Sequence, residues 1–291
     1  MTQFFQILIT GLVLGSIYSL AALGFSIVYS ATKVTNFANG EFVMMGGLVS
    51  ASLILSAHWP VWLAVLAACF LVALLGVLMD WLGLQHARRK TVLSYAMITI
   101  GLGISYRGLM QVVAGRELLF PPAFGLLPLV RAQGVFISGQ NLLILLTLVV
   151  VATGLSYLFL RTRMGKAMRA ASQQPRAAQL CGINPRHMAM VAFGMAGLLG
   201  ATAGALIAPV GAAFYEFGLG YGLKGFAAAV LGGFGSAPGA VIGGLLIGLA
   251  ESLTAGYIDS AYKDAVALLI LLVLLLIKPS GLLGRAEARR V

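Results

Sequence analysis

Charge is scarce in this sequence, and acidic residues are the scarcest. Only 9% of the 291 residues are charged, with 8 Asp and Glu against 19 Lys and Arg, while 60% are apolar. Soluble globular domains have roughly a quarter of their residues charged. The composition therefore excludes a soluble domain and indicates a polytopic membrane protein. The net charge of +11 does not predict a nucleic-acid partner, because the basic residues fall in short gaps between apolar runs.

Residues that carry catalytic or metal chemistry are also few. Cys69 lies in an apolar run and Cys181 in a basic segment, a spacing that predicts neither a disulfide nor a metal site. The sequence has no pattern typical of a catalytic triad and no G-x-x-x-x-G-K-[ST] phosphate loop. We therefore expect a protein that is not an enzyme, with no catalytic residues, no metal and no cofactor.

No Lys or Arg precedes Lys33, so the basic region of a cleavable signal peptide is missing and the first apolar run is expected to be retained. About 20 mostly apolar residues cross a bilayer. This length predicts an all-α fold of about eight transmembrane helices in a single membrane domain, residues 1–291. The predicted spans are 4–30, 36–56, 60–82, 91–114, 140–160, 187–209, a glycine-broken region 222–257, and 262–278.

The distribution of basic residues predicts the orientation. An N-terminus outside and a C-terminus in the cytoplasm place most of them inside: Lys33, Arg88, Arg89, Lys90, the six of segment 161–186, Lys278, Arg285, Arg289 and Arg290. With both 161–186 and the C-terminus inside, region 222–257 crosses the membrane twice or not at all. Glycines and Pro238 interrupt it, so we expect a discontinuous or re-entrant helix pair that lines a path.

A similar irregularity opens the second span, at 35–41. Interrupted helices in corresponding positions of two halves indicate a substrate path in transporters. The match between FANGEFVMMGG (37–47) and FAAAVLGG (226–233) is loose and leaves an internal repeat open. The candidate path residues are Asn36, Phe37, Asn39, Gly40, Glu41, Phe226, Gly232 and Gly233.

Polar groups in the membrane are expensive and therefore informative. For Asn36 and Glu41 the alternative to a path role is capping of an interrupted helix. Arg107 and Glu251 are expected to form a buried ion pair or a hydrogen bond to a backbone carbonyl. Asp80 is expected at the membrane interface.

The stretch 161–186, RTRMGKAMRAASQQPRAAQLCGINPR, has six basic residues and no acid. Met164, Ala167, Met168 and Ala171 form the stripe of a short amphipathic helix, which Gln174-Pro175 ends. A second short helix over 176–181 can stop at Gly182, before Asn184-Pro185 begins the next span. The narrow Ala/Met stripe suits docking into a groove on another protein, although an ordinary loop is the alternative.

Part of this stretch resembles a known motif. Ala177-Ala178-x-x-x-Gly182 is similar to the coupling motif of ABC importer permeases, in which Glu-Ala-Ala is followed three residues later by Gly; Arg176 stands where that motif has Glu. The resemblance implies that 161–186 rests on an ATPase. The residues it implicates are Gly165, Arg169, Ala170, Ala177, Ala178, Gly182, Asn184 and Arg186.

Longer strings resemble one family, the LivH-type permeases of branched-chain amino-acid ABC transporters: GKAMRAASQQPRAAQLCGIN, NFANGEF, GLKGFAAAVLGGFGSAPGAVIGGLLIGLAESL and YKDAVALLILLVLLLIKPSGLLGR. The resemblance implies a bacterial inner-membrane permease subunit with a second related permease, two cytoplasmic ATPases and a periplasmic binding protein. It implies import of a branched-chain or similar small apolar amino acid by alternating access. An ion-coupled secondary transporter is the alternative function.

Overall fold

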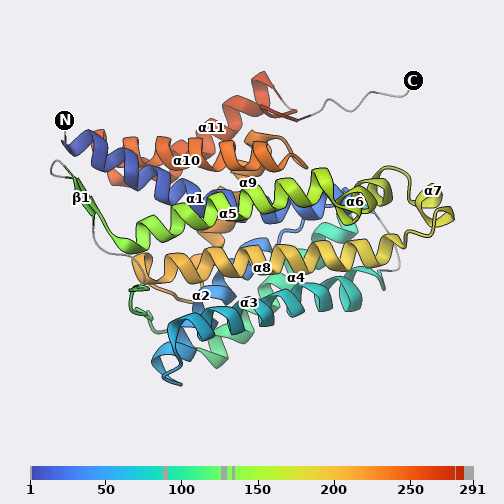
Figure 1. The fold of residues 1–291 in the computed structure, drawn as a ribbon, viewed down its shortest axis with the longest axis horizontal. Helices are drawn as coiled ribbons and strands as arrows, with labels where there is room; N and C mark the ends of the chain where they lie inside the picture. Colours follow the sequence, from blue (N-terminus) through green and yellow to red (C-terminus); the bar gives the residue numbers. More distant parts are fainter. Residues whose placement is uncertain (1, 88–90, 126–129, 133–134, 279, 285–291) are drawn as a thin grey trace.

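The computed structural model describes residues 2–87, 91–125, 130–132, 135–278 and 280–284. The fold is helical, with one short antiparallel hairpin (Figure 1). Arg88, Arg89, Lys90, Arg285, Arg289 and Arg290, which entered the orientation argument, lie outside the described residues. The elements are α1 (Thr2–Thr32), α2 (Asn39–Leu55), α3 (Val61–Leu78) with the π-helical turn η1 (Met79–Leu84), α4 (Val92–Val113), β1 (Val130–Ala132), β2 (Val135–Ile137), α5 (Gly139–Arg161), α6 (Arg163–Gln173), α7 (Pro175–Leu180), α8 (Pro185–Gly211), α9 (Phe217–Gly232), α10 (Ala237–Tyr257), η2 (Ser260–Tyr262) and α11 (Lys263–Ile277).

The helices confirm the all-α polytopic architecture. Among the described residues, seven helices have the length and apolar composition to cross a membrane, and α2 and α9 are shorter apolar helices. The N-terminal end of α1 and the hairpin lie at one end of the bundle, and α6 and α7 lie at the other (Figure 1). The basic residues predict that the α6–α7 end is cytoplasmic.

Region 222–257 is discontinuous, as predicted, and its two helices differ in length. Helix α9 begins earlier than predicted, at Phe217, and α10 is a full 21-residue helix. The break is the four-residue turn 233–236, where Gly233 and Gly235 adopt positive φ. Two helices fit because α9 recruits residues before 222 and because the turn between them is tight.

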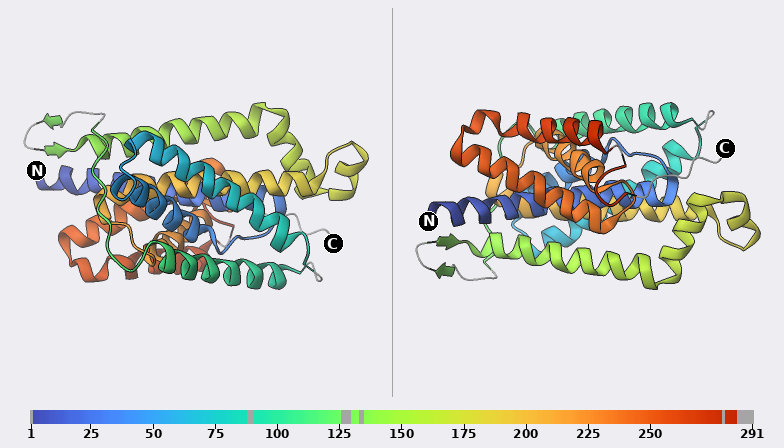
Figure 2. Two further views of the ribbon diagram at one scale, coloured as in Figure 1. Left: turned by 90° about the horizontal axis from the view of Figure 1, so that it is seen from below. Right: turned by 90° about the horizontal axis from the view of Figure 1, so that it is seen from above.

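The packing follows an inverted repeat. Helix α1 packs along α10 and also against α9, while α8 packs along α3 and also against α2. Exchanging α1 with α8, α2 with α9 and α3 with α10 therefore maps each pair onto its counterpart, and α1 and α8 run in opposite directions (Figures 1 and 2). This is the inverted-topology arrangement found in many transporters.

The two short helices cross at the centre of this repeat. A Cβ added at Gly40 would lie 2.9 Å from Gly222 Cα, and one added at Gly218 would press on Met44. Gly40 thus contacts Gly218 and Gly222 of α9, while Gly218 contacts Gly40 and Met44 of α2. Exchanging the two halves therefore pairs Gly40 with Gly218 and Met44 with Gly222. The loose sequence match, which placed 37–47 opposite 226–233, is therefore wrong in register, although the repeat exists.

Small residues let the long helices approach closely. A Cβ at Gly15 would lie 2.8 Å from Leu245 Cα, and one at Gly204 would overlap the carbonyl oxygen of Val43. Such contacts drive association in lipid, where no hydrophobic effect brings helices together. The outer helices contribute few buried residues: α11 buries Ala267, and α4 buries three residues along its length.

Asp80 lies just after the end of α3 and is buried within the protein. It is 3% exposed, and Gln85 Nε2 donates a 2.7 Å hydrogen bond to its Oδ2. Both residues belong to or directly follow η1, whose wider π-helical turn is a common local distortion at special sites. No pattern in the sequence predicted this turn.

Candidate functional site

The chain between α1 and α2 leaves helical geometry and is held by polar side chains. Asn36 Oδ1 accepts from Ala38 N at 3.0 Å, and Asn39 Nδ2 donates to Ala21 O at 3.0 Å. Thr99 on α4 accepts from Phe37 N at 3.3 Å. The bonds to Phe37 N and Ala38 N satisfy backbone groups that the helix interruption exposes, and the bond to Ala21 O ties the start of α2 to α1. For Asn36 the geometry favours the capping interpretation, although Ala38, not Asn36, occupies the N-cap position of α2.

Glu41 lies in the first turn of α2 and forms an ion pair with Arg107 of α4. The Glu41 side chain is 6% exposed and that of Arg107 is 25% exposed. Glu41 Oε2 and Arg107 Nε are buried, and neither has a hydrogen-bond partner among the described residues. The expected ion pair at Arg107 is thus present, and its partner is Glu41. The pair ties the interruption to α4 but leaves part of its hydrogen-bonding capacity unused.

An aromatic cluster (Phe25, Tyr29, Phe37, Phe226 and Phe234) joins the interruption to α9. The ring centroids of Phe37 and Phe226 are 5.9 Å apart, and Phe226 lies 5.7 Å from both Phe25 and Phe234. Phe234 continues to Tyr29 at 5.0 Å. Phe37 is 46% exposed, so one edge of the cluster faces open space. Contacts at these distances are favourable for aromatic rings and present an apolar surface.

Gly232 and Gly233 lie apart from Phe37, at the end of α9. Gly232 packs against Gly239 of α10, and Gly233 has a φ of 96° that an L side chain rarely adopts. The segment 280–284 caps the helix, since Leu282 N and Leu283 N donate to the carbonyls of residues 231 and 232 at 2.8 and 3.0 Å. These glycines lie at the end of α9, directly before Phe234 of the aromatic cluster.

The two short helices predicted in 161–186 are present as α6 and α7. Thr162 Oγ1 caps α6 by accepting from Gly165 N at 3.2 Å, Gly182 ends α7 with a φ of 78°, and Asn184 Oδ1 accepts from Arg186 N at 3.0 Å to begin α8. Each turn residue therefore has the role that its type predicts.

The faces of these helices differ from the prediction. Met168 and Ala171 are buried, and α6 packs against α1, α5 and α8 of the same chain. Ala178 is also buried. Gly165 is buried because it lies directly on the end of α5. Met168 and Ala171 of the Ala/Met stripe thus serve this chain's own core and are not available to a groove on another protein, whereas Met164 is 37% exposed. The candidate residues left exposed are Arg169, Ala177, Gly182, Asn184 and Arg186, with Ala170 half-buried.

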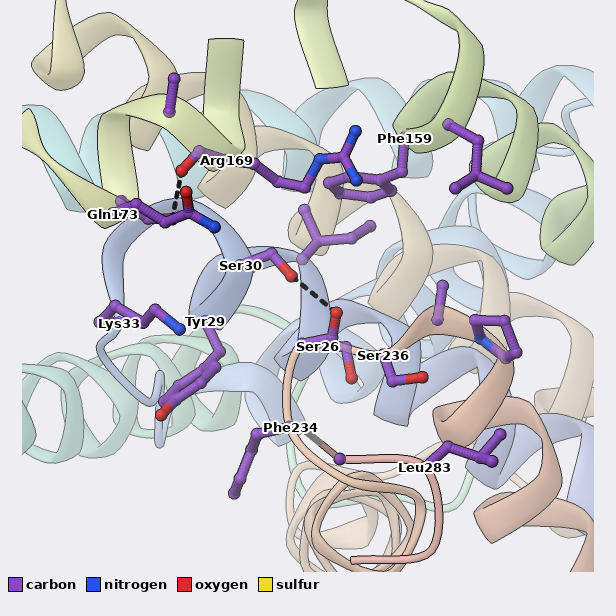
Figure 3. A pocket seen from close by; sticks show the side chains of 18 of the residues that line it. Ser26, Tyr29, Ser30, Lys33, Phe159, Arg169, Gln173, Phe234, Ser236 and Leu283 are labelled. Carbon is purple, nitrogen blue, oxygen red and sulfur yellow. Dashed lines mark hydrogen bonds between the residues drawn. The ribbon is translucent and has the colours of Figure 1, made fainter. Parts of the chain in front are cut away.

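A large cleft lies beside these packing contacts, between the α6–α7 element and part of the transmembrane core. It has a volume of about 1370 Å³ and lies between the ends of α1 and α5, the helices α6 and α7, the turn 233–236 and the segment 280–284. Figure 3 shows Arg169 and Lys33 extending into it beside Ser30, Ser236 and Gln173. Phe234 and Tyr29 of the aromatic cluster form part of its wall.

Comparison with known proteins decides the family. Residues 7–275 match the model of the branched-chain amino acid transport system / permease component family. The chain belongs to this family. The permease is 33% identical to the LivH permease protein of Salmonella typhimurium over 99% of this chain and 98% of LivH. It is 32% identical to the BraD permease protein of Pseudomonas aeruginosa, with the same coverage.

A solved structure of PsaBC from Streptococcus pneumoniae in complex with Fab contains a chain that aligns with 96% of the permease and 93% of its own length. The TM-score is 0.49 and the identity 13%.

One charged cluster of the permease was not predicted from the sequence. Lys224 of α9 lies 2.6 Å from Glu251 Oε1 of α10 and 2.7 Å from Asp264 Oδ1 of α11. Tyr18 of α1 donates to Glu251 Oε2 at 2.7 Å and accepts from Lys224 at 3.2 Å. Glu251 was expected to be paired, and Lys224 is its partner. A lysine inside the apolar string GLKGFAAAVLGG is the signal that could have identified this cluster.

Proposed function

We propose that this permease is the membrane-spanning subunit of an ATP-driven ABC importer that moves a branched-chain or similar small apolar amino acid into the cytoplasm by alternating access. The observation that carries the proposal is the match to LivH and BraD over nearly the whole of each chain. Both relatives are permease proteins of high-affinity branched-chain amino acid transport systems. The location is a bacterial inner membrane.

The partners are two cytoplasmic ATPase subunits, a second related permease and a periplasmic binding protein. The exposed side of α6 and α7 receives an ATPase, with Arg169, Ala177 and Arg186 available for contact. Gly165 and Ala178 support this surface from beneath, because they fix α6 and α7 to the core. Movement of the ATPase therefore reaches the bundle through buried contacts with α1, α5 and α8.

The substrate path runs beside the interruption before α2. Phe37 and Phe226 offer an apolar surface for an aliphatic side chain, and the Glu41–Arg107 pair lies in the following turn with unused polar atoms. Gly40 allows α2 and α9 to cross closely enough for the two halves to move against each other. Residues 1–291 act as one membrane domain.

Affinity purification of the permease in mild detergent tests the assembly. We expect ATPase subunits to copurify, and uptake of radiolabelled leucine by cells to stop when the ATPase gene is deleted. Uptake that follows an ion gradient and survives the deletion would instead support a secondary transporter.

The coupling surface has a separate test. Arg169→Glu reverses an exposed charge on α6, whereas Lys166→Glu makes the same change at another exposed position of the same helix. We expect Arg169→Glu to reduce substrate-stimulated ATP hydrolysis and transport with normal membrane insertion. Equal effects of the two variants would remove the specific role of Arg169.

A further inference from the structure

The outward face of α7 carries an apolar strip. Helix α7 lies at the end of the molecule opposite the hairpin, beyond the end of α5 and the start of α8 (Figures 1 and 2). Ala178 is buried on the inner side of α7, whereas Ala177, Leu180 and Cys181 are exposed. Their spacing of i, i+3 and i+4 places these three residues on one face. Leu180 is 91% exposed, so nothing in the described part of this chain covers the strip.

The backbone beneath the strip is fixed at its C-terminal end. Gly182 N donates to Gln179 O at 3.0 Å, and Ile183 N donates to Ala178 O at 2.9 Å. Together with the positive φ of Gly182, these two bonds form the Schellman motif that closes a helix. A contact residue on a backbone that is already ordered loses less conformational freedom on binding. Leu180 is therefore placed in advance to enter a complementary pocket on another molecule.

The charges around the strip are all positive. The six basic residues of segment 161–186 are exposed, and no acidic residue occurs between Glu117 and Glu216. None of the six takes part in an ion pair with another described residue. Arg176 lies four positions before Leu180 on the same face of α7, so its side chain borders the strip. A surface of one sign favours a partner that carries the opposite charge.

The position of the strip favours a protein over the membrane surface. An amphipathic helix that lies on a bilayer turns its apolar side toward the lipid. The inner side of α7 instead packs within this chain, through the buried Ala178 and contacts with α6 and α8, and the strip lies on the other side. Apolar residues at i, i+3 and i+4 are the pattern by which a helix enters a groove on another protein.

On the basis of the proposed function, we propose that the partner ATPase presents an acidic groove to α7, with an apolar pocket for Leu180 and a carboxylate that pairs with Arg176. The coupling motif that this segment resembles has Glu at the position of Arg176, so the charge contact is inverted here. Pairs of Arg with a carboxylate are directional, and this pair therefore sets how α7 lies in the groove. The contact runs through α7, since Met168 and Ala171 of α6 are buried.

Binding of the ATPase measures this contact without transport. The ATPase that copurifies with the full-length permease is isolated and titrated onto the permease in nanodiscs of phosphatidylcholine, and its affinity is measured by interferometry. Leu180→Ser should weaken binding about tenfold, the equivalent of ~1.4 kcal/mol, because the apolar pocket is left empty. Arg176→Glu should weaken binding at least as much. Both positions are exposed, and Glu suits the first turn of a helix, so neither variant should unfold α7.

A photo-crosslinking amino acid at position 180 identifies the groove. We expect a crosslink to the ATPase next to at least one acidic residue, and exchange of that acidic residue for Lys should restore the binding of Arg176→Glu. A crosslink to lipid would place α7 on the membrane and overturn the proposal.

Met164→Ser and Lys166→Glu are the matched controls, because each makes the same kind of change at an exposed position of α6. Both should bind the ATPase as the unaltered chain does. The proposal is wrong if Met164→Ser weakens binding as much as Leu180→Ser, or if Leu180→Ser and Arg176→Glu leave the affinity unchanged. If no ATPase copurifies with the unaltered permease, the proposed function itself fails.

Discussion

The two halves of the repeat each tie a short helix to an outer helix with an ion pair, but they do so differently. In the first half Glu41 of α2 pairs with Arg107 of α4, and each keeps a buried polar atom without a partner among the described residues. In the second half Lys224 of α9 bonds to Glu251, Asp264 and Tyr18, which joins four helices. A buried network that is fully satisfied rigidifies a structure, whereas a buried polar atom without a partner costs free energy.

This contrast assigns different mechanical roles to the halves. The Lys224 cluster links α9, α10 and α11 to α1, whereas the Glu41–Arg107 pair links α2 to α4 alone. The candidate path residues at 36–41 lie beside the Glu41–Arg107 pair, whereas Phe226, Gly232 and Gly233 belong to α9 or its end. We infer that α2 and α4 move during transport while the Lys224 cluster keeps the other half fixed.

Removal of the lysine gives the largest expected effect. Lys224→Met leaves Glu251, which is 3% exposed, without its cation, and breaking a buried pair from one side costs about 3–5 kcal/mol. Thermal unfolding in detergent measures the loss. The double variant Lys224→Met with Glu251→Gln removes both charges and should recover most of the stability. A double variant no more stable than the single one would contradict the role of the unpaired carboxylate.

A methyl group at the centre of the repeat should have the next largest effect. In Gly40→Ala the new Cβ meets backbone atoms of Gly218 and Gly222, which cannot rotate away, so we expect about 3 kcal/mol, the upper part of the range for overpacking. Gly220→Ala on α9 is the control, because a Cβ there has nothing within 4 Å. Thermal unfolding of the two variants side by side tests whether the crossing requires glycine. Similar unfolding temperatures would show that it does not.

Breaking the Glu41–Arg107 pair should lower stability less than removal of Lys224 does, and it should reduce transport more. Arg107→Met leaves Glu41, whose side chain is 6% exposed, without its cation. The Arg107 side chain is 25% exposed against 15% for Lys224, so water reaches the emptied site more easily. The loss should therefore be about 3 kcal/mol, the lower end of the range for breaking a buried pair from one side. Uptake of radiolabelled leucine should fall at least as strongly as in Lys224→Met with Glu251→Gln. Normal uptake by Arg107→Met would dissociate this pair from the substrate path.

The smallest effect is expected at the outer edge of the lysine cluster. Asp264→Asn removes one of the two carboxylates on Lys224, but Asp264 is 67% exposed and water screens the pair. Such surface pairs contribute below ~1 kcal/mol. A difference in unfolding temperature close to that of Lys224→Met would mean that α11 is fastened through Asp264 and not through Glu251.

Several features followed from the sequence because they depend on local chemistry. The positions of the long helices follow from apolar runs, and Gly182 and Asn184-Pro185 end and begin helices as their residue types require. The interruption at 35–41 was visible as polar residues in an apolar context. The family, too, was predicted from its motifs.

Other features depended on neighbours distant in the chain. Arg107 lies 66 residues from Glu41, and Lys224 lies 206 residues from Tyr18, so no local pattern could pair them. The Ala/Met stripe of α6 was predicted correctly as apolar, but its partner was not, because an apolar face has the same period whether it packs on its own chain or on another.

The sequence by itself determined the environment of this protein, since a chain with 9% charged residues and 60% apolar residues must place its long helices in lipid. It also determined where helices break, because glycine, proline and asparagine act on the backbone next to them. The tertiary structure alone decided which helices meet, the register of the inverted repeat and the partners of the buried charges. Those depend on the close approach of small residues and on Coulomb interactions between segments far apart in the chain, which only the packed bundle brings together.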